Sequence, residues 1–137
     1  MLSADRLLSR GAIAAWMMLI AIPLLWPLGP RIEGFLLPVT GKVQVSKVEQ
    51  RSEGLAFFVK FTKRRQCEFE AIIWYEGPVR LTLTFEPEAE QQHRTRPVGD
   101  QYIGPWLLNG VSDLDGVVAY VLHRCHPLWM TLTRFYP

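Results

Sequence analysis

The residue types in this sequence that could do chemistry gather near its C-terminal end, in the stretch HRCHPLWMTLTRFYP. There Cys125 lies between His123 and His126. Cys67, the other cysteine, would complete the four donors of a tetrahedral metal site. On a regular strand, however, His123 and Cys125 point to one face and His126 to the other, so convergence would require a bulge. The paired C-x2-C or H-x3-H clusters of zinc sites are also absent from the sequence. We therefore predict no metal, and keep a site of these four residues as the alternative to surface or hydrogen-bonded histidines.

A disulfide between Cys67 and Cys125 is the chemistry that we favour. Period-two alternation puts each cysteine on the same strand face as apolar residues, namely Phe69, Ala71 and Ile73 in one segment and Val117, Ala119 and Val121 in the other. Two inward-facing sulfurs from strands distant in the sequence can meet across a core. Closing a loop of this length contributes about 4 kcal/mol of stability by the chain-entropy estimate, provided that the compartment is oxidising.

Catalytic signatures are missing from the sequence. It contains no G-x-S-x-G, H-E-x-x-H, P-loop or C-x-x-C motif. Glu68 and Glu70 share one strand face, but outward-facing acids on an exposed strand are commonplace. The stretch SDLDG, with Asp113 and Asp115, lacks the remaining ligands of a calcium loop. We predict a protein that is not an enzyme and holds no cofactor.

One polar segment, residues 86–105, is the best candidate for a binding loop. It reads EPEAEQQHRTRPVGDQYIGP and separates two predicted strands. Loops of such length are uncommon in compact domains unless they bind something or are disordered. The side chains best suited to anchor a partner are Arg94, Arg96, Tyr102 and Trp106. Over binding, however, we favour a flexible connection with some extended pairing.

The groups described above are expected to be attached to a membrane span. The span is predicted at residues 11–30, which carry no charge. At about 1.5 Å per residue they cover about 30 Å, the hydrocarbon thickness of a bilayer. Trp16 and Trp26 lie toward the two ends, where indoles favour the interface. A cleaved signal peptide and a buried soluble helix are the alternatives, but the apolar stretch is long and no small-x-small site follows it. We predict a cytoplasmic N-terminus (1–10), a signal-anchor helix (11–30), a linker (31–40) and an exported domain (41–137).

The charges around the span set its expected orientation. Arg6 and Arg10 precede it with only Asp5 against them, whereas Arg31 and Glu33 follow it and cancel. Positive residues stay inside, so the N-terminus should be cytoplasmic and residues 31–137 exported.

The exported part is almost neutral. Of the 15 Lys and Arg and the 13 Asp and Glu of the chain, only Arg6, Arg10 and Asp5 precede the span, which leaves 13 basic against 12 acidic residues. A nucleic-acid surface needs a basic stripe, so we predict no nucleic-acid partner. The run Lys63-Arg64-Arg65 is a local exception, for which a solvated strand end is favoured over a phosphate site.

The exported part is predicted to be mainly β, because apolar residues alternate with polar ones over several short segments. The predicted strands cover residues 42–49, 55–62, 67–75, 79–85, 116–125 and 128–136. The turn residues Glu76-Gly77-Pro78 predict an antiparallel hairpin between the third and the fourth. This spacing indicates a small antiparallel β-sandwich of immunoglobulin-like architecture, with no helix after Arg31. Trp74 follows Cys67 too closely for a true immunoglobulin domain, and is expected on the same strand.

The stretches RQCEFEAIIWYEG, GPWLL and HRCHPLWMTLTRFYP resemble a loose group of short membrane-anchored proteins of proteobacteria and their tailed phages, over residues 40–137. The resemblance implies an inner-membrane anchor and a periplasmic domain, and transfers no activity or site residue. The expected function is a non-enzymatic protein-binding or structural module of the envelope, with another envelope protein as partner. Periplasmic metal binding and a phage-encoded envelope or exclusion factor are the alternatives, and a small-molecule ligand is left open.

Overall fold

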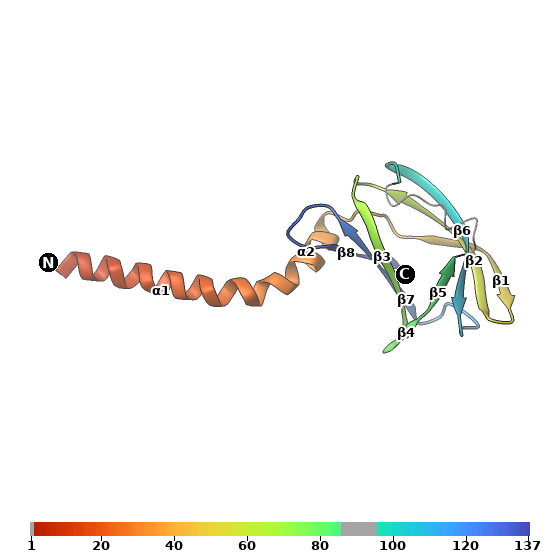
Figure 1. The fold of residues 1–137 in the computed structure, drawn as a ribbon, viewed down its shortest axis with the longest axis horizontal. Coiled ribbons are helices and arrows are strands. Elements are labelled where there is room, and N and C mark those ends of the chain that lie inside the picture. Colours follow the sequence, from red (N-terminus) through yellow and green to blue (C-terminus); the bar gives the residue numbers. More distant parts are fainter. Residues whose placement is uncertain (1, 86–95) are drawn as a thin grey trace.

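The computed structural model describes residues 2–85 and 96–137, with side chains from Arg10 onward. A long helix leads into two packed sheets (Figure 1). The helical part consists of α1 (Leu2–Leu25), a 3-10 turn η1 (Trp26–Leu28) and α2 (Gly29–Leu36). The strands of the described residues are β1 (Gln44–Arg51), β2 (Gly54–Lys63), β3 (Glu68–Glu76), β4 (Val79–Leu81), β5 (Leu83–Phe85), β6 (Gly99–Asn109), β7 (Val117–Arg124) and β8 (Thr131–Tyr136).

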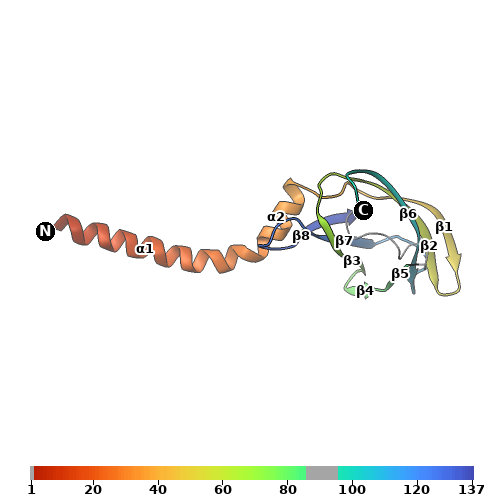
Figure 2. The same cartoon turned by 45° about the horizontal axis from the view of Figure 1, so that its top comes forward.

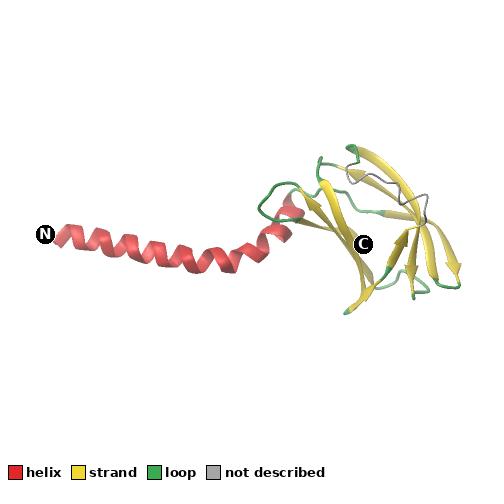
Figure 3. Cartoon of the chain, viewed as in Figure 1, coloured by secondary structure: helices red, strands yellow, loops and turns green. Residues whose placement is uncertain are grey.

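The strands form the predicted antiparallel β-sandwich. One sheet has the order β1-β2-β6-β5 and the other the order β4-β3-β7-β8, and the two lie face to face (Figure 3). The predicted hairpin at Gly77 is confirmed, since Trp74 of β3 is opposite Leu81 of β4. The chain then changes sheet at Thr82, because β5 pairs with β6 and not with β3. The hairpin thus connects the two layers.

The core fills the space between the sheets with large aromatic side chains. Trp74 and Phe57 are fully buried, with ring centroids 5.5 Å apart in an edge-on arrangement. Phe135 of β8 packs against Phe61 of β2, with ring centroids 5.1 Å apart. Such edge-on pairs add to the free energy of burying the rings themselves. Both sheets therefore share one core.

The predicted alternation along β3 is wrong beyond Phe69. The register with β7 shifts between Phe69 and Ala71, which makes Glu70 the extra residue of a β-bulge. One extra residue sends every following side chain to the opposite face. Trp74, expected to face outward, is therefore fully buried, whereas Tyr75, expected to face inward, lies on the outer surface.

Residues 99–105 of the segment 86–105 belong to β6, which pairs with β2, so the expected extended pairing is present and this last part is a strand instead of a loop. Glycine and proline suggested a loop, but Gly104 has a packing role. Its φ is +147°, and a β-carbon there would come within 2.9 Å of the Cα of Phe58. Glycine is required where two strands approach this closely around a bulge. Residues 86–95 lie outside the described part of the chain.

The predicted linker 31–40 is helical over its first half, contrary to the expectation of no helix after Arg31. α2 follows η1 directly and bends toward the sandwich (Figure 2). The next residues cross the end of the sandwich, where Val39 is fully buried and the N–H of Gly41 donates to the carbonyl of Thr62 at 2.8 Å. The span and the sandwich are thus joined by a folded connection.

The helix Arg10–Leu36 is long and apolar enough to cross a membrane, and none of its most apolar window is buried. A soluble core helix would be mostly buried, so this alternative is not supported. Tryptophan and leucine side chains of α1 are exposed along its length, including Trp16, Leu19 and Leu24.

Candidate functional site

The predicted disulfide is present and connects Cys67 with Cys125, whose Cα atoms are 4.6 Å apart. Its position differs from the expected one. The bond does not cross the core, because β3 and β7 are neighbours in one sheet and Glu68 lies opposite Arg124 beside it. The disulfide therefore fastens two adjacent strands at one end of the sheet.

The residues of the metal alternative do not converge. Both sulfurs are in the disulfide, and no group of three His, Cys, Asp or Glu that could hold a metal occurs in the described residues. His123 is 3% exposed and packs against Phe69, with ring centroids 6.1 Å apart. Burial, together with the charge of Lys63, lowers the pKa of His123 to about 4. His123 is thus a neutral core residue at physiological pH.

The four residues expected to anchor a partner have different surroundings. Arg94 lies outside the described residues, and Arg96 is half-buried, with its carbonyl accepting a 2.8 Å hydrogen bond from Lys63. Trp106 is only 6% exposed, because β6 directs it into the core. It is not the exposed anchor that the loop interpretation expected. Tyr102 is 54% exposed and remains available to a partner.

Tyr102 belongs to an exposed aromatic platform on the outer face of the sheet β1-β2-β6-β5. Its ring stacks on Phe58 of β2, with centroids 5.5 Å apart and planes 11° from parallel. The Lys47 ammonium lies 5.2 Å from the Phe58 ring and 5.9 Å from the Tyr102 ring. These distances are typical of cation–π contacts. We call Lys47, Phe58 and Tyr102 the aromatic platform.

The backbone of β1 is distorted where it supplies Lys47 to the platform. Lys47 has a φ of +49°, which a residue with a β-carbon rarely adopts, and the register with β2 shifts between Ser46 and Glu49. Such a conformation costs about 1 to 3 kcal/mol and persists only where its surroundings hold it. The bulge is what turns the Lys47 side chain over the two rings. Sequence alternation alone gave no signal for it.

A second cluster joins the span to the sandwich, centred on the carboxylate of Glu33 in α2. Its Oε1 accepts a 3.0 Å hydrogen bond from Arg65, and its Oε2 accepts bonds from Trp129 at 2.8 Å and His126 at 2.9 Å. The N–H of Leu128 donates to Nδ1 of His126, so the proton directed at Glu33 is on Nε2. We call Glu33, Arg65, His126 and Trp129 the joint cluster.

Glu33 lies beyond the uncharged stretch 11–30, and its side chain is 12% exposed. Burial alone raises the pKa of its carboxyl. The hydrogen bonds from His126, Trp129 and Arg65 outweigh burial and lower this pKa to about 2. A carboxylate that accepts several hydrogen bonds stays ionised in this way.

Trp129 also fixes the start of the connection. Its ring meets Trp26 of η1 edge-on, with centroids 5.3 Å apart. A β-carbon on Gly29 would lie 3.1 Å from the same ring, so the small residue allows α2 to begin there. His126, one of the four residues of the metal alternative, thus helps Trp129 to position the apolar helix. A joint of this kind has no local sequence signal, because Glu33 and Trp129 are distant in the chain.

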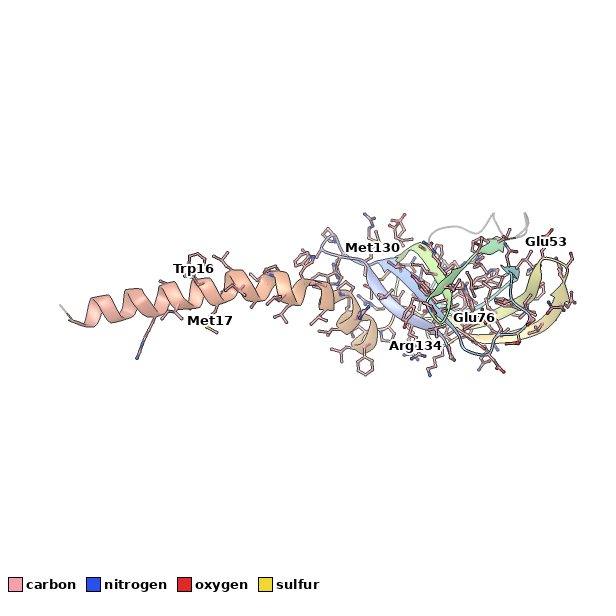
Figure 4. All side chains as sticks on the ribbon, turned by 90° about the horizontal axis from the view of Figure 1, so that it is seen from below. Trp16, Met17, Glu53, Glu76, Met130 and Arg134 are labelled. Atoms are coloured by element: carbon pink, nitrogen blue, oxygen red, sulfur yellow. A yellow bond between two sulfur atoms is a disulfide. The ribbon has the colours of Figure 1, made fainter. Side chains whose placement is uncertain are left out.

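A groove with a volume of about 930 Å³ lies between α2, the segment after it and the outer face of β3, β7 and β8. The cations at its walls are Arg31, Lys42, Arg64 and Arg134. Figure 4 shows Arg134 at the outside of the sandwich, on the side of α2.

No protein-family model, curated protein or solved structure matches this chain.

Proposed function

We propose that this chain is a single-pass protein of a bacterial inner membrane that presents its β-sandwich in the periplasm as a non-enzymatic module for binding another envelope protein. The N-terminus is then cytoplasmic, and the aromatic platform is the surface that meets the partner. The oxidised pair Cys67–Cys125 supports an exported sandwich, because disulfides persist outside the reducing cytoplasm. Arg10, at the start of the apolar stretch, supports this orientation, since positive residues remain inside.

The observation that carries the proposal is the exposed stack of Tyr102 on Phe58 under Lys47. Exposed aromatic residues and cations provide most of the binding energy in many protein interfaces. The platform is on the sheet farther from α1 (Figures 1 and 2). Because the joint cluster fixes the other sheet to the span, the platform faces away from the membrane, toward other proteins of the compartment.

Site-specific photo-crosslinking in native membranes tests the proposed partner. A photoreactive amino acid replaces Tyr102 in the full chain, and in a matched control it replaces Val79, which is 58% exposed on β4 of the other sheet. We expect one discrete crosslinked protein from position 102 and none from position 79. A Lys47→Ala substitution should reduce the yield from position 102. The same band from both positions, or none from position 102, would contradict the proposal.

The orientation has a separate test. A reporter enzyme that is active only in the periplasm is fused after Pro137 of the full chain, and a reporter active only in the cytoplasm is fused at the same point. We expect activity from the first fusion alone. Activity of the cytoplasmic reporter would overturn the proposed orientation, whatever the crosslinking result.

A further inference from the structure

The groove beside α2 has one sign of charge. Its walls carry Arg31, Lys42, Arg64 and Arg134, and among residues 10–85 and 96–137 no Asp or Glu lines it. None of these cations has a salt bridge or a side-chain hydrogen bond within the described residues. The contrast with their neighbours is clear: Arg65 is paired with Glu33, and the Lys63 ammonium donates to the carbonyls of Cys67 and Arg96. Four unpaired cations around one hollow attract an anion, because they repel one another without it.

The floor of the groove is apolar and aromatic. The side chains that form it come from the outer face of the sheet β4-β3-β7-β8, namely Ile73, Tyr75, Tyr120, Leu122 and Leu132, whereas the exposed Phe35 of α2 lies at the rim. Thr40 and Thr133, whose side chains are buried, also contribute to the lining of the groove. The ligand that fits is therefore an amphiphile, with an anionic head for the cations and a hydrocarbon part for the floor.

The order of the segments along the chain puts the groove at the membrane surface. Arg31 is the first charge after the uncharged stretch and stands in the first turn of α2. α2 has 8 residues, so that at ~1.5 Å per residue it spans about 12 Å, against a headgroup layer of roughly 5 to 7 Å per leaflet. The end of the groove at Arg31 must therefore be at the depth of the lipid headgroups.

The surface of α2 that faces away from the sandwich is apolar. Phe35 is 85% exposed, Leu36 66% and Ile32 53%, whereas Gly34 is buried against β8. In water such a row of exposed side chains is unfavourable. An interfacial helix shows this division, with its apolar face in the acyl boundary and cations nearby. The rim of the groove thus continues into the membrane itself.

We propose that this groove binds one anionic phospholipid of the bilayer that α1 crosses. Arg31, Lys42, Arg64 and Arg134 surround its phosphate, and the glycerol and the first part of the acyl chains lie along Phe35 and the aromatic floor. The site is independent of the proposed protein docking, because the aromatic platform is on the other sheet. Charge complementarity and continuity with the span both favour a lipid over an acidic protein segment.

Lipid retention by the full chain tests this proposal. The protein is purified in a neutral detergent, offered equal amounts of phosphatidylglycerol and phosphatidylcholine with the same acyl chains, and weighed by native mass spectrometry. We expect phosphatidylglycerol to be retained at least tenfold over phosphatidylcholine. The double substitution Arg64→Gln/Arg134→Gln should weaken phosphatidylglycerol binding about 30-fold, since each cation near an anionic lipid contributes about fivefold.

The matched control is Lys60→Gln/Arg80→Gln, which removes two exposed cations outside the groove and should leave retention unchanged. Lys42→Gln gives an independent variant with about a fivefold effect. Equal retention of both lipids, or an equal loss in the control, would overturn the proposal. Displacement of the lipid by an equal concentration of inorganic phosphate would also overturn it, by identifying a site for free anions. Because crosslinking from Tyr102 does not depend on the groove, this outcome leaves the proposed docking function standing.

Discussion

The carbonyl oxygen of Leu132 in β8 lies where a β-carbon on Gly34 in α2 would have to be. The helical connection after the apolar helix is thus in backbone contact with an edge strand of the sandwich. With the hydrogen bonds of Glu33, this contact fixes the direction of the sandwich relative to α2. A flexible linker would leave that direction open.

Gly34→Ala should separate α2 from β8, since the added methyl group collides with backbone that has little freedom to move. Overpacking of this kind costs about 1 to 3 kcal/mol. We expect faster proteolysis after α2 in detergent-solubilised full chain, with the sandwich itself intact. Gly11→Ala is the matched control, because a β-carbon there meets nothing within 4 Å. Equal protease resistance of both variants would contradict a fixed joint.

Glu33→Gln should loosen the same joint, because the amide cannot form the ion pair with Arg65. We expect a loss of about 2 kcal/mol, measured as a lower midpoint of thermal unfolding. Since the folded pKa of about 2 lies below the ordinary 4.5, the stability that Glu33 contributes is complete above pH 4.5 and lost toward pH 2. The stability of Glu33→Gln should not fall in this way as the pH drops. Glu53→Gln, at an exposed turn, is the control, and its stability should still fall toward pH 2.

Several features of the fold were predictable because they follow from local periodicity and composition. The uncharged stretch 11–30 predicted the apolar helix, and alternation with turn residues predicted the sandwich and the hairpin at Gly77. The pairing of Cys67 with Cys125 was also predicted, but its place between neighbouring strands of one sheet was not. Each of these inferences uses residues close together in the sequence.

The features that were not predicted depend on contacts between distant residues. The bulge at Glu70 inverts the later part of β3, and nothing in the alternation before it announces the extra residue. α2 is stabilised by β8 and by Trp129, so its own residues showed no convincing helical period. The groove could not be foreseen for the same reason, since its cations come from four separate segments.

The corrected phase of β3 has a direct test in two neighbouring aromatic residues. Trp74→Ala should cost about 3 to 5 kcal/mol, because it empties a fully buried site in the core. Tyr75→Ala, on the outer face, should cost less than about 1 kcal/mol. The measurement is chemical unfolding of the full chain in detergent. A larger loss of stability from Tyr75→Ala than from Trp74→Ala would instead support regular alternation along β3, without a bulge.

The disulfide should contribute about as much to stability as a large buried aromatic residue of the core. Its two cysteines are 58 residues apart, and cross-linking a loop of this length contributes about 4 kcal/mol. We expect Cys67→Ala/Cys125→Ala to lower the unfolding midpoint and to make it insensitive to reductant. The unsubstituted chain should fall to a similar midpoint in reductant. A midpoint that reductant does not change would show that the bond adds nothing.

His123 should make the sandwich less stable in mild acid. Burial first, and then the charge of Lys63, lower its pKa in the folded chain to about 4, against an ordinary value of 6.5. Between these values the unfolded chain binds a proton that the folded chain does not, so stability falls as the pH drops from 6.5 to 4 and loses nothing further from this group below. The total loss is about 3 kcal/mol. His123→Leu should remove this loss of stability, since Nδ1 has no hydrogen-bond partner within the described residues. Glu33→Gln should retain the loss, because Glu33 titrates at lower pH. Unfolding followed from pH 7 to pH 4 would contradict this account if His123→Leu kept the full slope.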